Sequence, residues 1–251
     1  MRIGAALVHL SPGPPFPVVE WAKQLVDAGF ESLWAPQVIG RGRLVPDPFV
    51  ALAAAATATA GSGIEVGTAT VQVPLHHPAD LAHRILSLML VCGDRLTLGL
   101  SPGSTAADFA ALDRDHTTRF RDFRSSVERL RGLLAHGRDE HADLAPAPAA
   151  GPPPLLLGSW GANVERAARE FDGWIASGHR RSPGEILAAH ERFRAAGGRR
   201  AVAGYVPART ADELRAAAEA LERYAAAGFD DAVLLLAPGG PEPAQVRALH
   251  P

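Results

Sequence analysis

Apolar residues along the chain follow two alternating spacings, and this alternation predicts eight strands separated by helices. Short continuous apolar runs are typical of strands buried in a parallel sheet, whereas apolar residues three and four positions apart predict helices with one buried face. The predicted strands cover residues 3–10, 32–35, 65–71, 95–100, 155–159, 173–178, 201–206 and 231–237. Strands that alternate with helices in this way favour an α/β fold, a closed (β/α)8 TIM barrel.

Local signals set the ends of several predicted helices. Gly29 is placed to end the first helix, and Ser182 followed by Pro183 is a typical helix start. Pro48 and Gly61 bound an alanine-rich helix over residues 49–60. A later helix is predicted to bury Phe120, Phe123, Val127, Leu130 and Leu134. Residues 101–115 form a polar insertion, and residues 137–154, rich in proline and charge, predict a surface loop.

Length and composition exclude several classes of protein. The chain has 251 residues and a formal net charge of −2. No linker divides it, so we predict one barrel domain over residues 1–251. A net charge this small indicates no excess of basic residues of the kind that binds nucleic acid. Cys92, the single cysteine, permits no internal disulfide and no cysteine-rich metal site. Adjacent residues such as His76 and His77 rarely share one metal, so we predict no metal.

The chain shows no sign of a membrane segment. No apolar run reaches the roughly 18 residues that a membrane-spanning helix needs. The first residues lack the long apolar core of a signal peptide. We therefore expect a cytoplasmic protein that does not contact a membrane.

Three predicted strands end in glycine and small hydroxyl residues just before a helix. These junctions lie within residues 65–70, 96–104 and 155–161. Glycine lets a ligand approach the backbone, and the start of the next helix offers free N–H groups to an anion. Three such junctions predict one shared ligand-binding rim.

Six short segments also resemble a known family. They are VDAGFESLW at 26–34, DPFVALA at 47–53, GTAT at 67–70 with Pro74 and His77-Pro78, DRLTLGL at 94–100, residues 158–161 with Arg166-Ala167-Ala168, and FDGW at 171–174. Their order and spacing resemble the bacterial luciferase-like monooxygenase family over about residues 3–180. Each segment by itself is weak evidence for the family, and the similarity beyond residue 180 is looser.

The resemblance implies a TIM barrel that binds FMN or the deazaflavin F420 at the carboxyl ends of its strands. The chain is rich in alanine and arginine, and this composition, by itself and not through any particular residue, favours F420 over FMN. The implied cofactor-binding residues are Ala69, Thr70, Val71, Ser101, Gly103, Ser104, Gly158, Ser159, Trp160, Gly161, Ser177, Gly178, His179 and Arg180. Family members often carry a cis peptide bond that does not involve proline in the third strand, and we place it at Thr70-Val71.

Each group of these residues also has an ordinary structural interpretation. Residues 69–71 are then a plain strand end, Ser104 a helix cap and Trp160 a core side chain. Arg180 and Arg181, which would otherwise pair with phosphate, are then solvated on a loop.

Gln37 and His9 are the catalytic candidates. His9 ends the first predicted strand, although a structural histidine is the alternative there. Many F420-dependent relatives carry an Asp-His pair after the second strand, and this chain has Gln37-Val38 instead. Valine cannot transfer a proton, so alcohol or sugar-phosphate dehydrogenation of that type is in doubt. A reductase needs less from this position because the cofactor carries the chemistry, and Gln37 can still hydrogen-bond substrate or ring.

Three functions follow as hypotheses. The first is an F420- or FMN-dependent oxidoreductase that exchanges a hydride with a small organic substrate. The second is an FMN-dependent monooxygenase. The third is a barrel with little or no cofactor, which binds a ligand or partner without catalysis. The resemblance also implies a homodimer.

Overall fold

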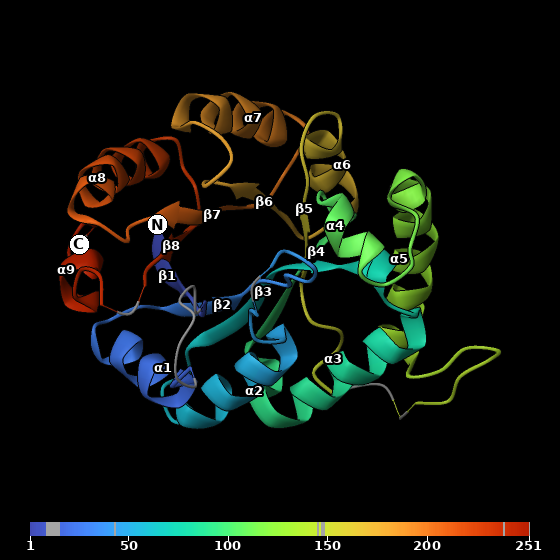
Figure 1. Ribbon diagram of the computed structural model, residues 1–251. Coiled ribbons are helices and arrows are strands. Elements are labelled where there is room, and N and C mark those ends of the chain that lie inside the picture. Colours follow the sequence, from blue (N-terminus) through green and yellow to red (C-terminus); the bar gives the residue numbers. More distant parts are fainter. Residues whose placement is uncertain (9–15, 43, 145, 147–148, 238, 251) are drawn as a thin grey trace.

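The computed structural model describes residues 1–8, 16–42, 44–144, 146, 149–237 and 239–250, and it confirms the closed barrel (Figure 1). The eight parallel strands pair in chain order, and the last pairs with the first. They are β1 Arg2–Ala6, β2 Ser32–Ala35, β3 Glu65–Gln72, β4 Leu96–Ser101, β5 Leu155–Gly158, β6 Gly173–Ser177, β7 Arg200–Pro207 and β8 Asp231–Leu235.

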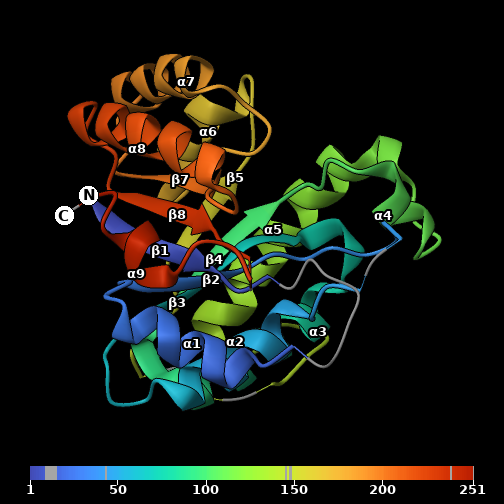
Figure 2. The same ribbon diagram turned by 60° about the vertical axis from the view of Figure 1, so that its left-hand side comes forward.

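Helices surround the barrel and return the chain from one strand to the next (Figures 1 and 2). The long helices are α1 Val18–Asp27, α2 Pro48–Ala58, α3 Pro78–Cys92, α5 Arg119–His136, α6 Asn163–Glu170, α7 Pro183–Ala195 and α8 Ala211–Ala226. Two short helices, α4 Ala106–Ala110 and α9 Pro243–Arg247, lie in segments where the sequence predicted none. Three 3-10 turns, Val73–Leu75, Gly93–Arg95 and His116–Thr118, complete the described elements.

The helix starts form as their sequences require. Asp47 caps α2, because its carboxylate accepts the backbone N–H of Phe49 at 2.9 Å. Ser182 and Glu185 form a reciprocal capping box at α7. These caps satisfy backbone donors that have no partner inside the helix. They therefore fix the residue at which the loop before each of these helices ends and the helix begins.

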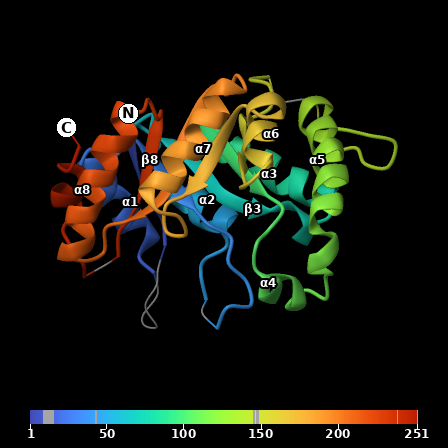
Figure 3. The same cartoon turned by 90° about the horizontal axis from the view of Figure 1, so that it is seen from above.

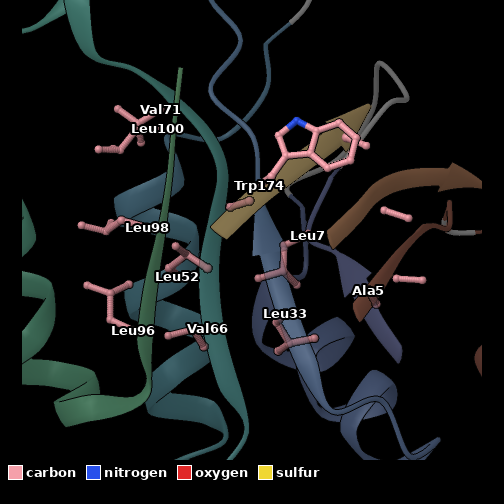
Figure 4. Close-up of a cluster of buried hydrophobic side chains, with 14 of the residues drawn as sticks. Ala5, Leu7, Leu33, Leu52, Val66, Val71, Leu96, Leu98, Leu100 and Trp174 are labelled. Atoms are coloured by element: carbon pink, nitrogen blue, oxygen red, sulfur yellow. The ribbon is translucent and has the colours of Figure 1, made fainter. Parts of the chain in front are cut away.

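The core has two parts, one inside the barrel and one between strands and helices. Trp34, Ile175 and Tyr205 belong to the inner cluster. Figure 4 shows part of the outer layer, with Val71 and Leu100 among its side chains. Alternate residues of each strand supply the two parts, since successive side chains point to opposite faces.

Charged residues fill the amino-terminal end of the barrel. Arg200, the first residue of β7, donates to Asp231 of β8 and to Glu65 of β3, at 2.8 Å in both cases. Arg2 of β1 pairs with the same two carboxylates. Burial alone would raise the pKa of Glu65, but the neighbouring Arg200 and Arg2 lower it below its usual value. These ion pairs close the end of the barrel opposite the predicted ligand rim.

Some expected boundaries differ from the structure. Phe120 is 40% exposed, because the first turn of α5 lies at the barrel mouth and does not pack against the strands. The strand predicted over residues 3–10 ends at Ala6, and its last two residues lie outside the described part of the chain. None of the described helices is long and apolar enough to cross a membrane.

Candidate cofactor and substrate site

A cavity of about 820 Å³ opens at the carboxyl ends of the strands. Its lining includes the last residues of six strands, Gln72, Ser101, Gly158, Ser177, Pro207 and Leu235. The insertion with α4 and the loop after β2 project from this same end of the barrel (Figure 3). Active sites of (β/α)8 barrels form at this face, so the cavity is the candidate site.

Most of the residues predicted from sequence line this cavity. They are Gln37, Ala69, Thr70, Ser101, Gly103, Ser104, Gly158, Ser159, Trp160, Ser177, His179 and Arg180. The three glycine-containing junctions therefore share one rim, as their pattern predicted.

The other four predicted residues are not part of the described lining. Val71 is fully buried in the layer between strands and helices. Gly178 donates its backbone N–H to Gly204 O at 2.6 Å, which places it within the strand ladder. Gly161 has a φ of +65° and open space where a side chain would stand. His9 lies outside the described residues.

The third strand changes direction at the cavity floor. The cis peptide bond joins Ala69 and Thr70, one residue before the predicted Thr70-Val71 position, so that placement was wrong. The pairing of β3 with β4 shifts register between Ala69 and Val71. The Thr70 hydroxyl donates to Ser101 Oγ at 2.8 Å. A Cβ on Gly158 would lie 2.5 Å from Thr70 Cγ2, so β5 approaches this bend only because residue 158 has no side chain.

Arginines dominate the charge of the cavity, and the sequence interpretation missed most of them. Arg41, Arg119, Arg181 and Arg209 join Arg180, and the described lining contains no carboxylate and no lysine. In the sequence, these arginines could have been recognised by their positions, a few residues after β2, β6 and β7 or at the start of α5. An excess of guanidinium groups over acids favours an anionic ligand.

Three of these arginines have acidic partners outside the lining. Arg41 forms a two-point ion pair with the fully buried Asp108 of α4. Arg209 pairs in the same way with Glu213.

Arg181 pairs with Glu185 at 3.1 Å, and its guanidinium lies 4.7 Å from the centre of a Trp160 ring. Arg119 and Arg180 have no carboxylate partner among the described residues. The cavity therefore carries two uncompensated positive charges.

Gln37 lies in a buried polar network that fixes its amide. Its Oε1 accepts the backbone N–H of Gln72 at 2.9 Å. Its NH2 group must therefore donate to His76 Nε2, 2.7 Å away, which places the His76 proton on Nδ1. Burial, with a smaller effect of Arg84, lowers the pKa of His76. The neutral ring thus holds Gln37 in place, and Gln72 continues the network to Asp108 at 2.7 Å.

His179 stands at the rim after β6, between Ser177 and Arg180. Its Nδ1 lies 3.2 Å from Ser177 Oγ, and its Nε2 accepts a long hydrogen bond from Arg180 Nε at 3.4 Å. Burial and the charges of Arg180, Arg41 and Arg209 lower its pKa below 6.5. His179 is therefore neutral at pH 7, with the lone pair on Nε2.

Tyr205 lies beside His179, with ring centres 6.0 Å apart in an edge-on arrangement. Its φ of +58° is rare for a residue with a side chain and costs about 1–3 kcal/mol. The β7–β8 ladder also shifts register between Ala203 and Val206. Burial raises the pKa of Tyr205 well above its usual value, and its hydroxyl has no partner among the described residues.

The cavity suits a planar group that carries an anionic side chain. Its volume lies in the range of small-molecule and cofactor sites, roughly 300–1,000 Å³. Small and apolar residues form its deeper wall, among them Ala69, Ile175 and Leu235. Hydroxyl and glycine residues and two free guanidiniums surround its mouth. FMN and F420 have this combination of a flat ring and a phosphate, so the residues present fit either group.

Comparison with known proteins identifies the class. The sequence matches the family described as luciferase-like monooxygenase over residues 3–247. The chain therefore belongs to the luciferase-like monooxygenase family, as its six motifs indicated. Among the described residues no cluster of metal-ligating side chains is present.

Two curated relatives are similar in sequence. The chain is 33% identical over 120 residues to a 4-hydroxyprotoasukamycin monooxygenase of Streptomyces nodosus subsp. asukaensis, which covers 47% of this chain and 30% of the relative. It is 29% identical over 198 residues to an F420-dependent hydroxymycolic acid dehydrogenase of Mycobacterium tuberculosis, which covers 72% of this chain and 54% of the relative. The matches thus span about a third to a half of the curated relatives' lengths.

Solved structures share the fold. Monooxygenase RslO1 of Streptomyces bottropensis superposes with a TM-score of 0.78 at 18% identity, covering 99% of this chain and 97% of its own. The oxygenating component of 3,6-diketocamphane monooxygenase of Pseudomonas putida, in complex with FMN, gives 0.67 at 19% identity, covering 90% and 75%. The similar proteins thus include an F420-dependent dehydrogenase and a monooxygenase component in complex with FMN.

Proposed function

We propose that the protein is an oxidoreductase that uses F420 to transfer a hydride to or from a small organic substrate. The observation that carries this proposal is the cavity itself, which joins an apolar wall to a mouth with two free guanidiniums and no carboxylate among its described residues. The similarity to an F420-dependent dehydrogenase over 72% of the chain supports F420 as the cofactor.

In this proposal two loops and a bend of β3 hold the cofactor. Ser101 ends β4 and is followed by Gly103 and Ser104, and Ser159 and Trp160 follow β5. Their hydroxyl and backbone N–H groups would bind the phosphate side, while the Ala69-Thr70 bend would lie under the ring. When bound, the cofactor supplies a ring carbon that accepts or gives a hydride.

His179 is the residue proposed to move the proton that accompanies the hydride. Oxidation of an alcohol releases a hydride from carbon and a proton from oxygen, and reduction requires both to return. Among the described lining residues, His179 is the only histidine, the residue type best suited to exchange protons at physiological pH. Its Nε2 can accept or return the proton once the long hydrogen bond from Arg180 is broken. Gln37, fixed by Gln72 and His76, is proposed to orient substrate or ring without exchanging protons.

An FMN-dependent monooxygenase is the second candidate. The 33% identity to a monooxygenase and the match to the structure that contains FMN favour it. The same phosphate loops would serve FMN, so the cavity supports both cofactors.

Equilibrium titration of the purified protein with F420 and with FMN tests the proposal. We expect saturable fluorescence changes with both cofactors and roughly tenfold tighter binding of F420, a difference of about 1.4 kcal/mol. Tighter binding of FMN would favour the monooxygenase. Absence of binding, together with an unchanged melting temperature at saturating concentrations, would contradict both candidates and support a barrel without a cofactor.

A further inference from the structure

Arg180 is the free cation on the β6 side of the cavity. Its side-chain hydrogen bonds within the described part of the chain are long ones to neutral groups, His179 Nε2 at 3.4 Å and Thr105 Oγ1 at 3.5 Å. The next residue, Arg181, has both a carboxylate and an aromatic partner. Most N–H donors of Arg180 therefore remain available to a ligand.

The surroundings of Arg180 leave one positive charge uncompensated. Arg41 and Arg209 lie close enough to His179 that their charges act on it together with that of Arg180. Arg41 is neutralised by Asp108 and Arg209 by Glu213. One monovalent anion would balance the remaining charge, and a carboxylate matches the planar, two-donor edge of a guanidinium.

The other free cation, Arg119, is the first residue of α5 and lines the same cavity. A Cβ on Gly103 would lie 2.7 Å from the Phe109 ring, which packs edge-on against His116 with ring centres 5.0 Å apart. Arg119 in turn donates to His116 O at 3.0 Å. This chain of contacts connects Arg119 to the loop after β4, and both line the cavity. Its Nε is buried and has no partner among the described residues.

We propose that these two cations serve two anions: Arg119 the phosphate of the cofactor, and Arg180 a carboxylate of the substrate. This assignment rests on the proposed function, and it moves Arg180 from the phosphate role that the sequence suggested. The substrate is then a small organic acid, with its carboxylate at the rim beside His179. Its apolar body extends along the wall that contains Ile175 and Leu235.

Matched neutral and anionic probes test the assignment. The cofactor-loaded protein is titrated with benzoate and with benzamide, which have the same ring and differ in charge, while the cofactor spectrum is recorded. We expect benzoate to bind roughly tenfold or more tightly than benzamide, as for a charge-assisted pair. Arg180→Gln removes this preference and leaves cofactor affinity within about twofold. Arg192→Gln, on the outer surface of α7 and paired with Glu165, is the control and keeps the preference.

Two results would overturn the proposal. Equal affinities for benzoate and benzamide in the unmodified protein would show that no carboxylate site exists beside the ring. Weaker F420 binding by Arg180→Gln, with FMN binding unchanged, would assign Arg180 to the carboxylate tail of F420. Both results still require a bound cofactor, so they are distinct from a failure of the proposed function, in which the unmodified protein binds neither F420 nor FMN.

Discussion

Single residues at the cavity have properties that follow from their immediate neighbours. His179 is neutral because burial and three arginines disfavour its charged form. Tyr205 has a backbone conformation that side chains rarely adopt, and its hydroxyl is buried. Gly158 permits β5 to lie against Thr70. Each property is testable by changing one side chain.

The lowered pKa of His179 sets the pH dependence of a reaction in which this residue accepts a proton. The neutral form is required, and it predominates above a pKa that lies below 6.5. We therefore expect kcat/KM to stay constant from pH 8 to about 6.5 and to fall at lower pH. His179→Asn should remove that acidic limb while cofactor binding persists. A limb that survives in this variant would assign the proton transfer to another group.

Gly158→Ala should weaken cofactor binding. The new Cβ would lie 2.5 Å from Thr70 Cγ2, so the Thr70 side chain or the bend at Ala69-Thr70 must shift into the space proposed for the ring. We expect roughly a tenfold loss of affinity, about 1.4 kcal/mol, measured by fluorescence titration. Gly132→Ala, at a helical position with open space around it, is the control and should bind cofactor normally.

At the scale of elements, a polar network ties the insertion after β4 to the rest of the mouth. Asp108 of α4 is fully buried, accepts Gln72 Nε2 at 2.7 Å and pairs with Arg41 of the loop after β2. The end of β3, the loop after β2 and the insertion after β4 are thus joined through one carboxylate. The short helix α4 makes this connection, although it is too short to be stable alone.

Asp108→Leu should destabilise the mouth and leave the barrel intact. Gln72 and the partly buried Arg41 would lose a hydrogen-bond acceptor, at a cost of about 1–3 kcal/mol. We expect a lower urea midpoint and faster proteolytic cleavage within residues 101–115. Arg114→Leu, at an exposed position of the same segment, is the control. Unchanged cleavage in the Asp108 variant would show that α4 is held by other contacts.

Strands and long helices were predictable from sequence because each depends on a local spacing of apolar residues. The glycine junctions likewise contain eight of the predicted lining residues, since parallel strands all end at one rim, and the family resemblance added Gln37, Ser177, His179 and Arg180. Helix α4 was missed because tertiary contacts of Asp108 and Phe109 stabilise it. Arg41, Arg119 and Arg209 were missed because the conformation of the mouth, which has no periodic signal, decides where long side chains reach.

At the scale of the whole molecule, the two ends of the barrel have opposite roles. The amino-terminal end is closed by Arg2, Glu65, Arg200 and Asp231, whose charges are paired. The carboxyl end holds the cavity, where positive charge exceeds negative charge. The residues that stabilise the barrel are therefore separate from those that line the cavity. Substitutions among the ion pairs should leave the structure of the cavity unchanged, and substitutions in the cavity should leave the ion pairs unchanged.

Arg200→Met should destabilise the fold strongly. It removes a cation that pairs with both Glu65 and Asp231, and it leaves Asp231, which has no exposed side-chain surface, with Arg2 alone. We expect a loss of about 3–5 kcal/mol in the free energy of unfolding, measured by denaturant unfolding. Arg215→Met, in an exposed pair with Asp212, should change it by less than about 0.5 kcal/mol. A small effect at Arg200 would show that the ion pairs contribute little.

A crystal structure of the complex with F420 tests the central claim most directly. The account predicts the ring against the Ala69-Thr70 bend, the phosphate between Ser101, Ser104 and Ser159, and Arg180 free to meet a second anion. A mouth filled by its own side chains after soaking with F420 and with FMN would contradict the account.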